Sequence, residues 1–371
     1  MKSRAPLVFL AVGGMLGLVP WLQGLLDFPI FYLIFLYFVF FWVAQASSWN
    51  MLTGYSGYFS FGQGAFYGVG VYTTATLVDK FDINFLVSLP LAGINAAILG
   101  LGVGFAVFRL RKLRGELFAL LTLAVALVVA SVIRNVDVID GGYGVPLGRV
   151  PYPEFLGDYS TMLYHLGLII ALLTVFVAYT IQYSRLGSGL FAIRDDEAVA
   201  EGLGVPTFRY KMIVLAISCF FAGLSGGLHA LQINYVAVES VFNLRVPLFV
   251  ILMSVLGGRQ HWMGPVFGAV IIHTLSDRFS SAQLEFLNQI IIGSLLIIMI
   301  LFVREGIFTR LQRRAWFSLG LFGLLLMVQI LAGIGDKLIT QAAIAMLVMI
   351  ATLLIPDAAY KKITRRVRIP C

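Results

Sequence analysis

The chain has 371 residues, of which 60% are hydrophobic and only 12% are charged. Soluble domains usually carry about 25% charged residues, so this composition excludes an ordinary soluble protein and predicts a polytopic membrane protein. The two cysteines and four histidines are scattered, without the spacing of a disulfide framework or a metal site. We therefore expect no metal site. On the motifs considered below, we also expect no catalytic residue and no cofactor bound by this chain.

Crossing a bilayer requires roughly 20 apolar residues, and this criterion predicts an all-α, polytopic transmembrane helix bundle. The first span follows Lys2 and Arg4 and could pass for a signal peptide, but no convincing cleavage site follows, so we expect a retained helix. Some of the short glycine-rich spans can be re-entrant rather than complete crossings. The twelve predicted spans lie near residues 5–23, 28–49, 60–78, 84–108, 115–134, 161–182, 212–234, 246–257, 262–276, 286–303, 315–335 and 338–356.

The stretch from Thr53 to Thr76 is uncharged but contains six glycines. Each glycine weakens a helix by about 1 kcal/mol relative to alanine in water, so we expect a broken or tightly packed helix. Irregular backbone at membrane depth is tolerated only where protein or a water-filled cavity satisfies its N–H and C=O groups. The stretch is therefore predicted to line a path through the protein rather than to face lipid.

Basic residues concentrate in alternate loops, which tests the predicted helices independently through the positive-inside rule. With the N-terminus inside, 20 of the 26 Lys and Arg residues lie on the cytoplasmic side. Both termini are therefore predicted to be cytoplasmic. The net charge of +8 is explained by membrane orientation, and no basic face with interleaved aromatics indicates a nucleic-acid partner.

Two loops carry specific expectations. The segment 135–160 is rich in glycine, proline and acidic residues, which favours an ordered outer loop or lid over a helix. The inner loop 183–211 is predicted to contain a short helix over 193–203, with acidic residues near its N-terminus, where the helix dipole favours negative charge. This helix belongs either to a solvated amphipathic loop or to a docking element for a cytoplasmic partner.

Two glycine-rich segments share one spacing, with Gly57, Gly64 and Gly68 in the first and Gly257, Gly264 and Gly268 in the second. Small residues four apart let transmembrane helices approach closely. Transporters often hold their path between duplicated, interrupted helices, so the repeated glycine spacing favours a pseudo-symmetric pathway. Ordinary helix packing is the alternative explanation for each glycine pair.

The motifs of enzymes and proton-driven carriers are largely absent. No G-x-x-x-x-G-K-[ST] motif is present, so ATP-driven work would have to come from another chain. No carboxylate falls near the middle of a predicted helix, which disfavours proton-coupled transport. Ser56 and Ser225 each fit the G-x-S-G motif of rhomboid intramembrane proteases, but no partner histidine motif accompanies them, and an enzyme is not expected.

Three blocks of the sequence carry a family resemblance: NMLTGYSGYFSFGQGAFYGVGVY at 50–72, then 114–123 with 141–144, and finally 184–204 with 256–268. Together they resemble the permease subunits of ATP-binding-cassette importers for branched-chain amino acids, in particular the M-type subunits. The resemblance covers roughly residues 28–314. It implies an importer permease domain of about ten helices over 1–314, with a cytoplasmic coupling loop at 183–211.

The resemblance also implies partners and a location. The permease would lie in the bacterial or archaeal cytoplasmic membrane, surrounded by lipid and paired with a second homologous permease subunit. Two cytoplasmic ATPase subunits, holding ATP and Mg²⁺, and an extracytoplasmic solute-binding protein would complete the importer. The coupling helix seated in the ATPase would include Arg194, Asp195, Asp196, Glu197, Ala200, Glu201 and Gly204.

Candidate path-lining residues are taken from the glycine-rich segments and their polar neighbours: Asn50, Ser60, Gly62, Gln63, Gly64, Phe66, Gly68, Thr122, Gly264 and Gly268. Gln63 stands where family members often carry histidine, and Phe61 replaces a common leucine. Chains of the family usually end soon after a segment like 302–307, whereas 315–371 here predicts two extra helices and a basic cytoplasmic tail.

The expected solute is a branched-chain or similar neutral amino acid, and urea or short amides fit the uncharged spans equally well. An ATPase-independent channel or carrier for a small neutral solute is a function of another class. It fits the neutral spans but gives the loop 183–211 no role. Whether the permease pair is homodimeric or heterodimeric stays open at this point.

Overall fold

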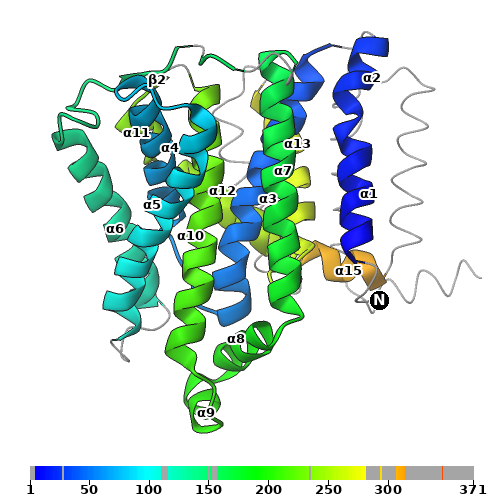
Figure 1. The fold of residues 1–371 in the computed structure, drawn as a ribbon. Helices are drawn as coiled ribbons and strands as arrows, with labels where there is room; N and C mark the ends of the chain where they lie inside the picture. The colour runs from blue at the N-terminus through cyan, green and yellow to red at the C-terminus, as the bar shows by residue number, and fades with distance from the viewer. Residues whose placement is uncertain are drawn as a thin grey trace, which may run out of the picture.

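The computed structural model describes residues 5–26, 29–109, 116–148, 150–152, 157–233, 235–280, 293–294, 306–313 and 345. Within these residues the protein is an all-α bundle, as predicted, and its only sheet is a pair of two-residue strands. Seven helical segments in the described part of the chain are long and apolar enough to cross a membrane. The long helices run between two opposite ends of the bundle (Figure 1).

The first span lies at one side of the bundle and consists of α1 (Ala5–Gly17) and α2 (Val19–Leu26). The helices are separated at Leu18, close to Pro20, whose nitrogen has no hydrogen to donate to the preceding turn. The span packs against α7 (Tyr159–Gln182) and is otherwise largely exposed. The predicted helix 5–23 is present but interrupted.

Helix α3 (Phe31–Ser56) is the central helix of the bundle. It contacts α7, α10 (Thr207–Gln232), α12 (Arg245–Gly257) and α13 (Gly264–Ser280). Every residue from 43 to 56 is buried. The sequence predicted that this span ends at 49, but contacts on all sides extend the helix by two turns despite the poor propensity of its last residues.

The glycine-rich stretch is broken, as predicted. Gly57 ends α3 with a φ of 78°, a left-handed conformation that glycine adopts without steric cost. After the turn 57–62, α4 (Gln63–Asp79) runs back toward the end of the bundle where α3 begins. Both helices are packed inside protein, which satisfies the constraint on irregular backbone in a membrane.

Helices α5 (Phe85–Phe108) and α10 pack closely against α4. The approach depends on small residues, since a Cβ at Gly70 would lie 2.1 Å from the carbonyl oxygen of Gly223. Helix α6 (Glu116–Asn135) flanks α4 and contacts α5 only sparsely. The core is therefore built around α3, α4, α5 and α10, and α6 lies at its edge.

One end of the bundle carries a lobe formed by α8 (Arg185–Asp195) and α9 (Glu197–Gly202). Helix α1 begins at the same end, where α15 (Ile307–Arg313) also lies (Figure 1).

The opposite end is closed by ordered connections. Strand β1 (Val145–Pro146) pairs antiparallel with β2 (Tyr235–Val236), and α11 (Val238–Val241) leads into α12. The described part of the segment 135–160 is thus mainly an ordered loop, as predicted.

The prediction of one helix over 193–203 was wrong. Helix α8 ends at Asp195, and Asp196 is extended, with φ −159° and ψ 113°. The Asp196 carboxylate accepts hydrogen bonds from the N–H groups of Ala198 and Val199, and so caps a separate helix. The predicted spans 286–303, 315–335 and 338–356, and the boundary after residue 314, lie essentially outside the described residues.

A prediction follows from the crossing of α12 and α13. A Cβ at Gly268 would lie 1.7 Å from the carbonyl oxygen of Met253, a backbone atom that cannot rotate away. Gly268→Ala should destabilise the protein by about 1–3 kcal/mol or more through overpacking. The measurement is the thermal unfolding midpoint of the purified protein in detergent.

Gly102→Ala on α5 is the matched control, because a Cβ there meets nothing within 4 Å. It should leave the midpoint unchanged or raise it, since alanine is the better helix former. Equal midpoints for the two variants would contradict the close crossing.

Candidate functional site

The turn 57–62 begins at the exposed Gly57, and its residues Tyr58, Ser60 and Gly62 are buried where neighbouring helices bind the backbone. Trp49 Nε1 on α3 donates to Ser60 O over 2.7 Å. The N–H of Phe61 donates to Thr122 Oγ1 on α6 over 3.0 Å. These bonds replace the water that an irregular segment would otherwise need. The turn is thus held between α3 and α6.

Gln63, the first residue of α4, belongs to a buried polar network that joins three helices. Its Nε2 donates to Gln45 Oε1 over 2.7 Å and to Ser48 Oγ over 2.9 Å, both on α3. Gln45 Nε2 donates in turn to Ser225 Oγ over 3.0 Å on α10. The network fixes the start of α4 against α3 and α10 with uncharged groups only.

All ten candidate path residues are buried in the single chain. Ser60, Gly62, Phe66 and Thr122 lie together where α4 begins beside α6, since a Cβ at Gly62 would lie 3.2 to 3.3 Å from atoms of each of the other three. Asn50 is also buried, and its Oδ1 has no hydrogen-bond partner within the described part of the chain.

The glycines of α4 meet the α11–α12 region. A Cβ at Gly68 would lie 2.4 Å from the ring of Phe242, and one at Gly64 would lie 3.5 Å from Pro247 Cδ. Both contacts are with side chains. The first glycine-rich segment therefore packs against the segment that leads into the second.

The second segment packs mainly on itself. A Cβ at Gly257 would lie 1.8 Å from the carbonyl oxygen of Gly264, and one at Gly264 would lie 1.9 Å from that of Gly258. Partial burial lowers the pKa of His261 in the turn between α12 and α13. The structure does not bring Gly264 and Gly268 against the glycines of α4.

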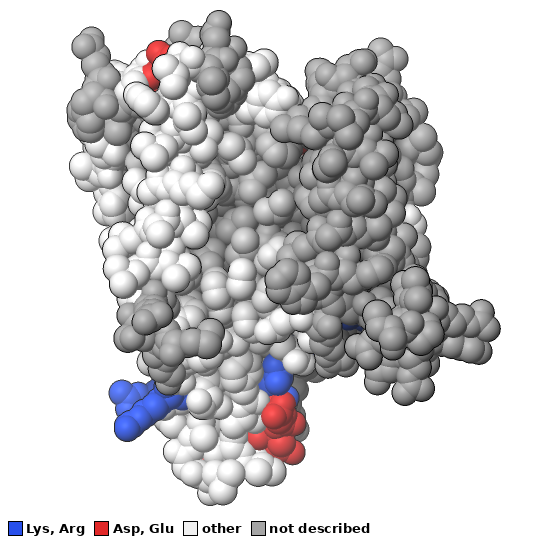
Figure 2. Space-filling model, turned by 90° about the vertical axis from the view of Figure 1, so that its right-hand side faces the viewer, with Lys and Arg blue, Asp and Glu red and all other residues white. Residues whose placement is uncertain are grey.

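The α8–α9 lobe contains the candidate coupling residues. Figure 2 shows acidic side chains on the lobe at the bottom of the view, close to basic ones, below a band of described surface without charged residues. Val199 and Leu203 are 58% and 80% exposed. Of the coupling candidates, Glu197 and Ala200 are buried and Arg194 is half-buried, whereas the exposed ones are Asp195, Asp196, Glu201 and Gly204.

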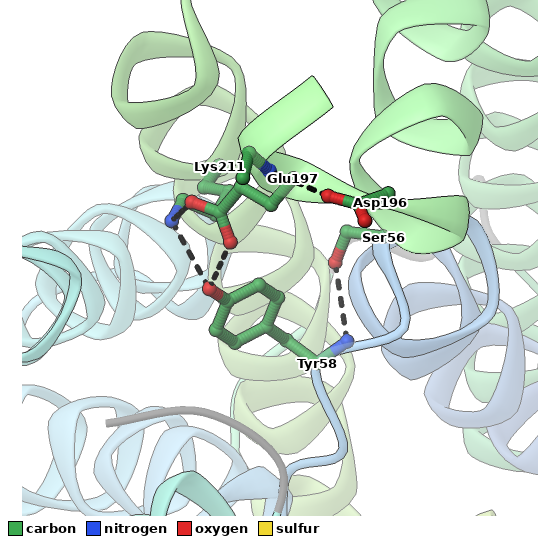
Figure 3. Close-up of polar contacts among 6 residues, drawn as sticks. Ser56, Tyr58, Asp196, Glu197 and Lys211 are labelled. Carbon is green, nitrogen blue, oxygen red and sulfur yellow. Dashed lines mark hydrogen bonds and ion pairs between the residues drawn. The ribbon is translucent and has the colours of Figure 1, made fainter. Parts of the chain in front are cut away.

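Glu197 points into the bundle and forms a buried cluster with Tyr58 and Lys211 (Figure 3). Tyr58 Oη donates to Glu197 Oε2 over 2.5 Å. Lys211 Nζ donates to Glu197 Oε1 over 2.6 Å and to Tyr58 Oη over 3.2 Å. The lysine and glutamate side chains are only 3% and 10% exposed. The cluster therefore joins α9, α10 and the turn 57–62.

Sequence reasoning missed Tyr58 and Lys211 as members of a site. It placed Lys211 in the loop 183–211, whereas α10 already begins at Thr207. A charge at the edge of a long apolar run was the available signal, because a buried ammonium needs an acceptor. The tyrosine gave no such signal.

The serines of the two G-x-S-G motifs are engaged within their own helices. Ser56 Oγ donates to Leu52 O over 2.7 Å, and Ser225 Oγ donates to Phe221 O over 2.8 Å. Such bonds to the preceding turn are usual for serine in membrane helices.

A groove of about 700 Å³ lies between α4, α5 and α6. Its walls are mostly apolar, and Asn95 Nδ2 donates there to Thr73 Oγ1 over 3.3 Å. None of the ten path candidates lines this groove.

Comparison with known proteins identifies relatives. The family described as "Branched-chain amino acid transport system / permease component" matches residues 31–301. The LivM high-affinity branched-chain amino acid transport permease of Escherichia coli K12 is 29% identical over 283 residues, which are 70% of this chain and 65% of LivM. The chain thus spans about 65% of that relative's length.

Two further relatives widen the comparison. The LivH high-affinity branched-chain amino acid transport permease of Escherichia coli K12 is 25% identical over 283 residues, 71% of this chain and 90% of LivH. The guanosine ABC transporter permease NupP of Bacillus subtilis is 32% identical over 126 residues, 33% of this chain and 35% of NupP. No solved structure matches the chain.

The network around Gln63 yields a double-mutant prediction. Gln63→Ala leaves the side-chain amide oxygen of Gln45, Oε1, without the donor that lies closest to it. The substitution should lower the free energy of unfolding by about 1–3 kcal/mol. Gln45→Ala should cost a similar amount. The double variant should cost less than the sum, because each single variant leaves a buried partner unpaired. Unfolding with SDS in mixed micelles measures all three, and additive costs would contradict the network.

Proposed function

The chain belongs to the family of branched-chain amino acid transport permease components, and on this premise we propose that it is the membrane-spanning permease of an ATP-driven importer. In this proposal it moves branched-chain or similar neutral amino acids from an extracytoplasmic binding protein to the cytoplasm. The family is one of transport permease components rather than enzymes, and ATP hydrolysis is assigned to other chains. Two separate ATPase subunits supply the ATP and Mg²⁺ chemistry.

The α8–α9 lobe is the observation that carries the proposal. Helix α9 projects beyond the bundle, and Leu203 at its end is 80% exposed. Val199 on the same short helix is 58% exposed, and Asp195, Asp196 and Glu201 are exposed on the same lobe. Exposed apolar surface bordered by polar residues marks protein interaction sites. Buried Ala200 fixes α9 on its inner face. We assign the exposed face to the ATPase.

The lobe end of the bundle is cytoplasmic in this proposal, and the membrane is the inner membrane of a bacterium or archaeon. Helix α1 begins at the lobe end, which supports a cytoplasmic N-terminus. The positive-inside distribution supports the same orientation. The second unit, 315–371, is proposed to add two helices and a basic cytoplasmic tail to the permease domain 1–314.

A second homologous permease subunit is proposed to complete the path. Asn95 lies near the middle of α5 and is exposed, with its amide bonded to Thr73. A polar amide facing hydrocarbon is unfavourable, so this surface supports contact with protein rather than lipid. The solute-binding protein would dock at the opposite end from the lobe, where Tyr143 is 86% exposed.

The interior network supports a solute without net charge. Its members are amides and hydroxyls, among them Gln63 at the start of α4 and Gln45 and Ser48 on α3. Such groups suit a zwitterionic or neutral molecule better than an ion. Leucine, isoleucine and valine are the proposed solutes, with urea and short amides as alternatives of the same importer type.

Substitution of the exposed end of α9 tests the ATPase contact. Leu203→Glu places a charge in the proposed interface and should weaken ATPase association about tenfold or more, as expected for an interface anchor. Co-purification of the ATPases with the tagged permease in detergent measures this. Tyr143→Glu, an exposed residue at the other end, is the matched control. Equal retention of ATPase by the two variants would contradict the assignment of the exposed face of α9 to the ATPase.

Reconstitution tests the transport itself. The permease pair, ATPases and binding protein in liposomes should take up labelled leucine only with ATP and the binding protein present. Unlabelled isoleucine and valine should compete, and urea, acetamide and guanosine should not. Uptake without the ATPases would instead indicate a channel or carrier.

A further inference from the structure

The cluster of Tyr58, Glu197 and Lys211 connects the lobe to the glycine-rich turn. We propose that it is a mechanical tie, in which these three side chains transmit a displacement of α9 to the turn 57–62 and thereby to α4. The inference rests on the proposed function, because α9 is displaced only if an ATPase acts on it. These are positioning residues, and none of them is proposed to touch the solute.

The tie is specific in its geometry. Both carboxylate oxygens of Glu197 are used, one by Tyr58 at 2.5 Å and the other by Lys211 at 2.6 Å. The ammonium also lies 4.7 Å from the centre of the Tyr58 ring and 4.9 Å from that of Phe108. Phe118 packs against Tyr58 from α6, with ring centres 5.3 Å apart. The aromatic rings cover one side of the pair, and Tyr58 and Glu197 also line a pocket of about 260 Å³. Removing one partner of such a buried charge pair is strongly unfavourable, because it leaves the other charge uncompensated.

The lobe has a second attachment to the same region. Arg194 Nη1 at the end of α8 donates to Gly54 O over 3.4 Å. A Cβ at Gly57 would lie 2.9 Å from Arg194 Cγ. The α8–α9 junction thus rests on the end of α3, and the extended residue Asp196 lies between the two attachments.

The connection continues from Tyr58 into α4. Tyr58 O accepts from Thr53 Oγ1 over 3.0 Å, and Ser60 Oγ accepts the N–H of Gly62, the residue before α4, over 3.1 Å. Only four residues separate Tyr58 from Gln63. A short, internally bonded turn transmits displacement because it has little slack. Movement of Glu197 therefore reaches the segment that carries Gly64 and Gly68.

The experiment measures coupling in the reconstituted importer, as solute molecules taken up per ATP hydrolysed. Tyr58→Phe removes one hydroxyl and keeps the ring, and the ratio should fall about fivefold or more because a hydrogen bond to a charged group is lost. Tyr55→Phe is the matched control. It removes a buried hydroxyl that donates to Ala178 O over 3.2 Å, so its acceptor lies on α7 and not on α9. The control should stay near the wild-type ratio.

The outcomes separate the tie from a general structural role. An unchanged ratio for Tyr58→Phe, or an equal fall for Tyr55→Phe, would overturn the tie. Glu197→Lys should uncouple transport, and adding Lys211→Glu should restore part of the ratio by reversing the pair. Absence of any restoration would also overturn it. If the wild-type importer shows no ATP-dependent uptake, the proposed function fails rather than the tie.

Discussion

A backbone reversal inside a membrane bundle has no water to bind, so protein must satisfy its polar groups. The turn 57–62 meets this requirement with Trp49 on one side and Thr122 on the other. This arrangement requires α3 and α6 to lie close to the turn. It also requires the second half of α3, residues 43–56, to be buried by other helices. Much of the bundle can be understood as the enclosure of this one irregular segment.

The position of the turn also explains how the α8–α9 lobe is connected to α4. The turn meets α9 through Tyr58 and leads directly into α4 and the network of Gln63. A single six-residue connection therefore borders both the proposed ATPase contact and the proposed path. In the proposed importer, a displacement of α9 would reach α4 directly through this turn, without a long series of intervening residues.

Composition and periodicity predicted the bundle and the break near Gly57, because apolar length and glycine content are local properties. They could not predict where α3 ends, since the burial of Thr53 and Gly54 by other helices decides it. The separate α9 depends on the capping geometry of Asp196. The inward direction of Glu197 depends on Tyr58, 139 residues away in the chain. Such long-range pairs leave no trace in a single sequence.

Helices α4 and α13 meet the α11–α12 region in different ways. Between α12 and α13 the contacts are backbone on backbone, as at Gly268 and Met253, whereas Gly68 on α4 meets the ring of Phe242. Backbone atoms within helices cannot move aside independently, but a side chain can change its rotamer. The α12–α13 contact is therefore stiff, whereas the contact of α4 with the α11–α12 region can yield. A tilt of α4 would be absorbed on that side by rotation of the Phe242 ring, and α10, whose Gly223 carbonyl closely approaches Gly70, would move together with α4.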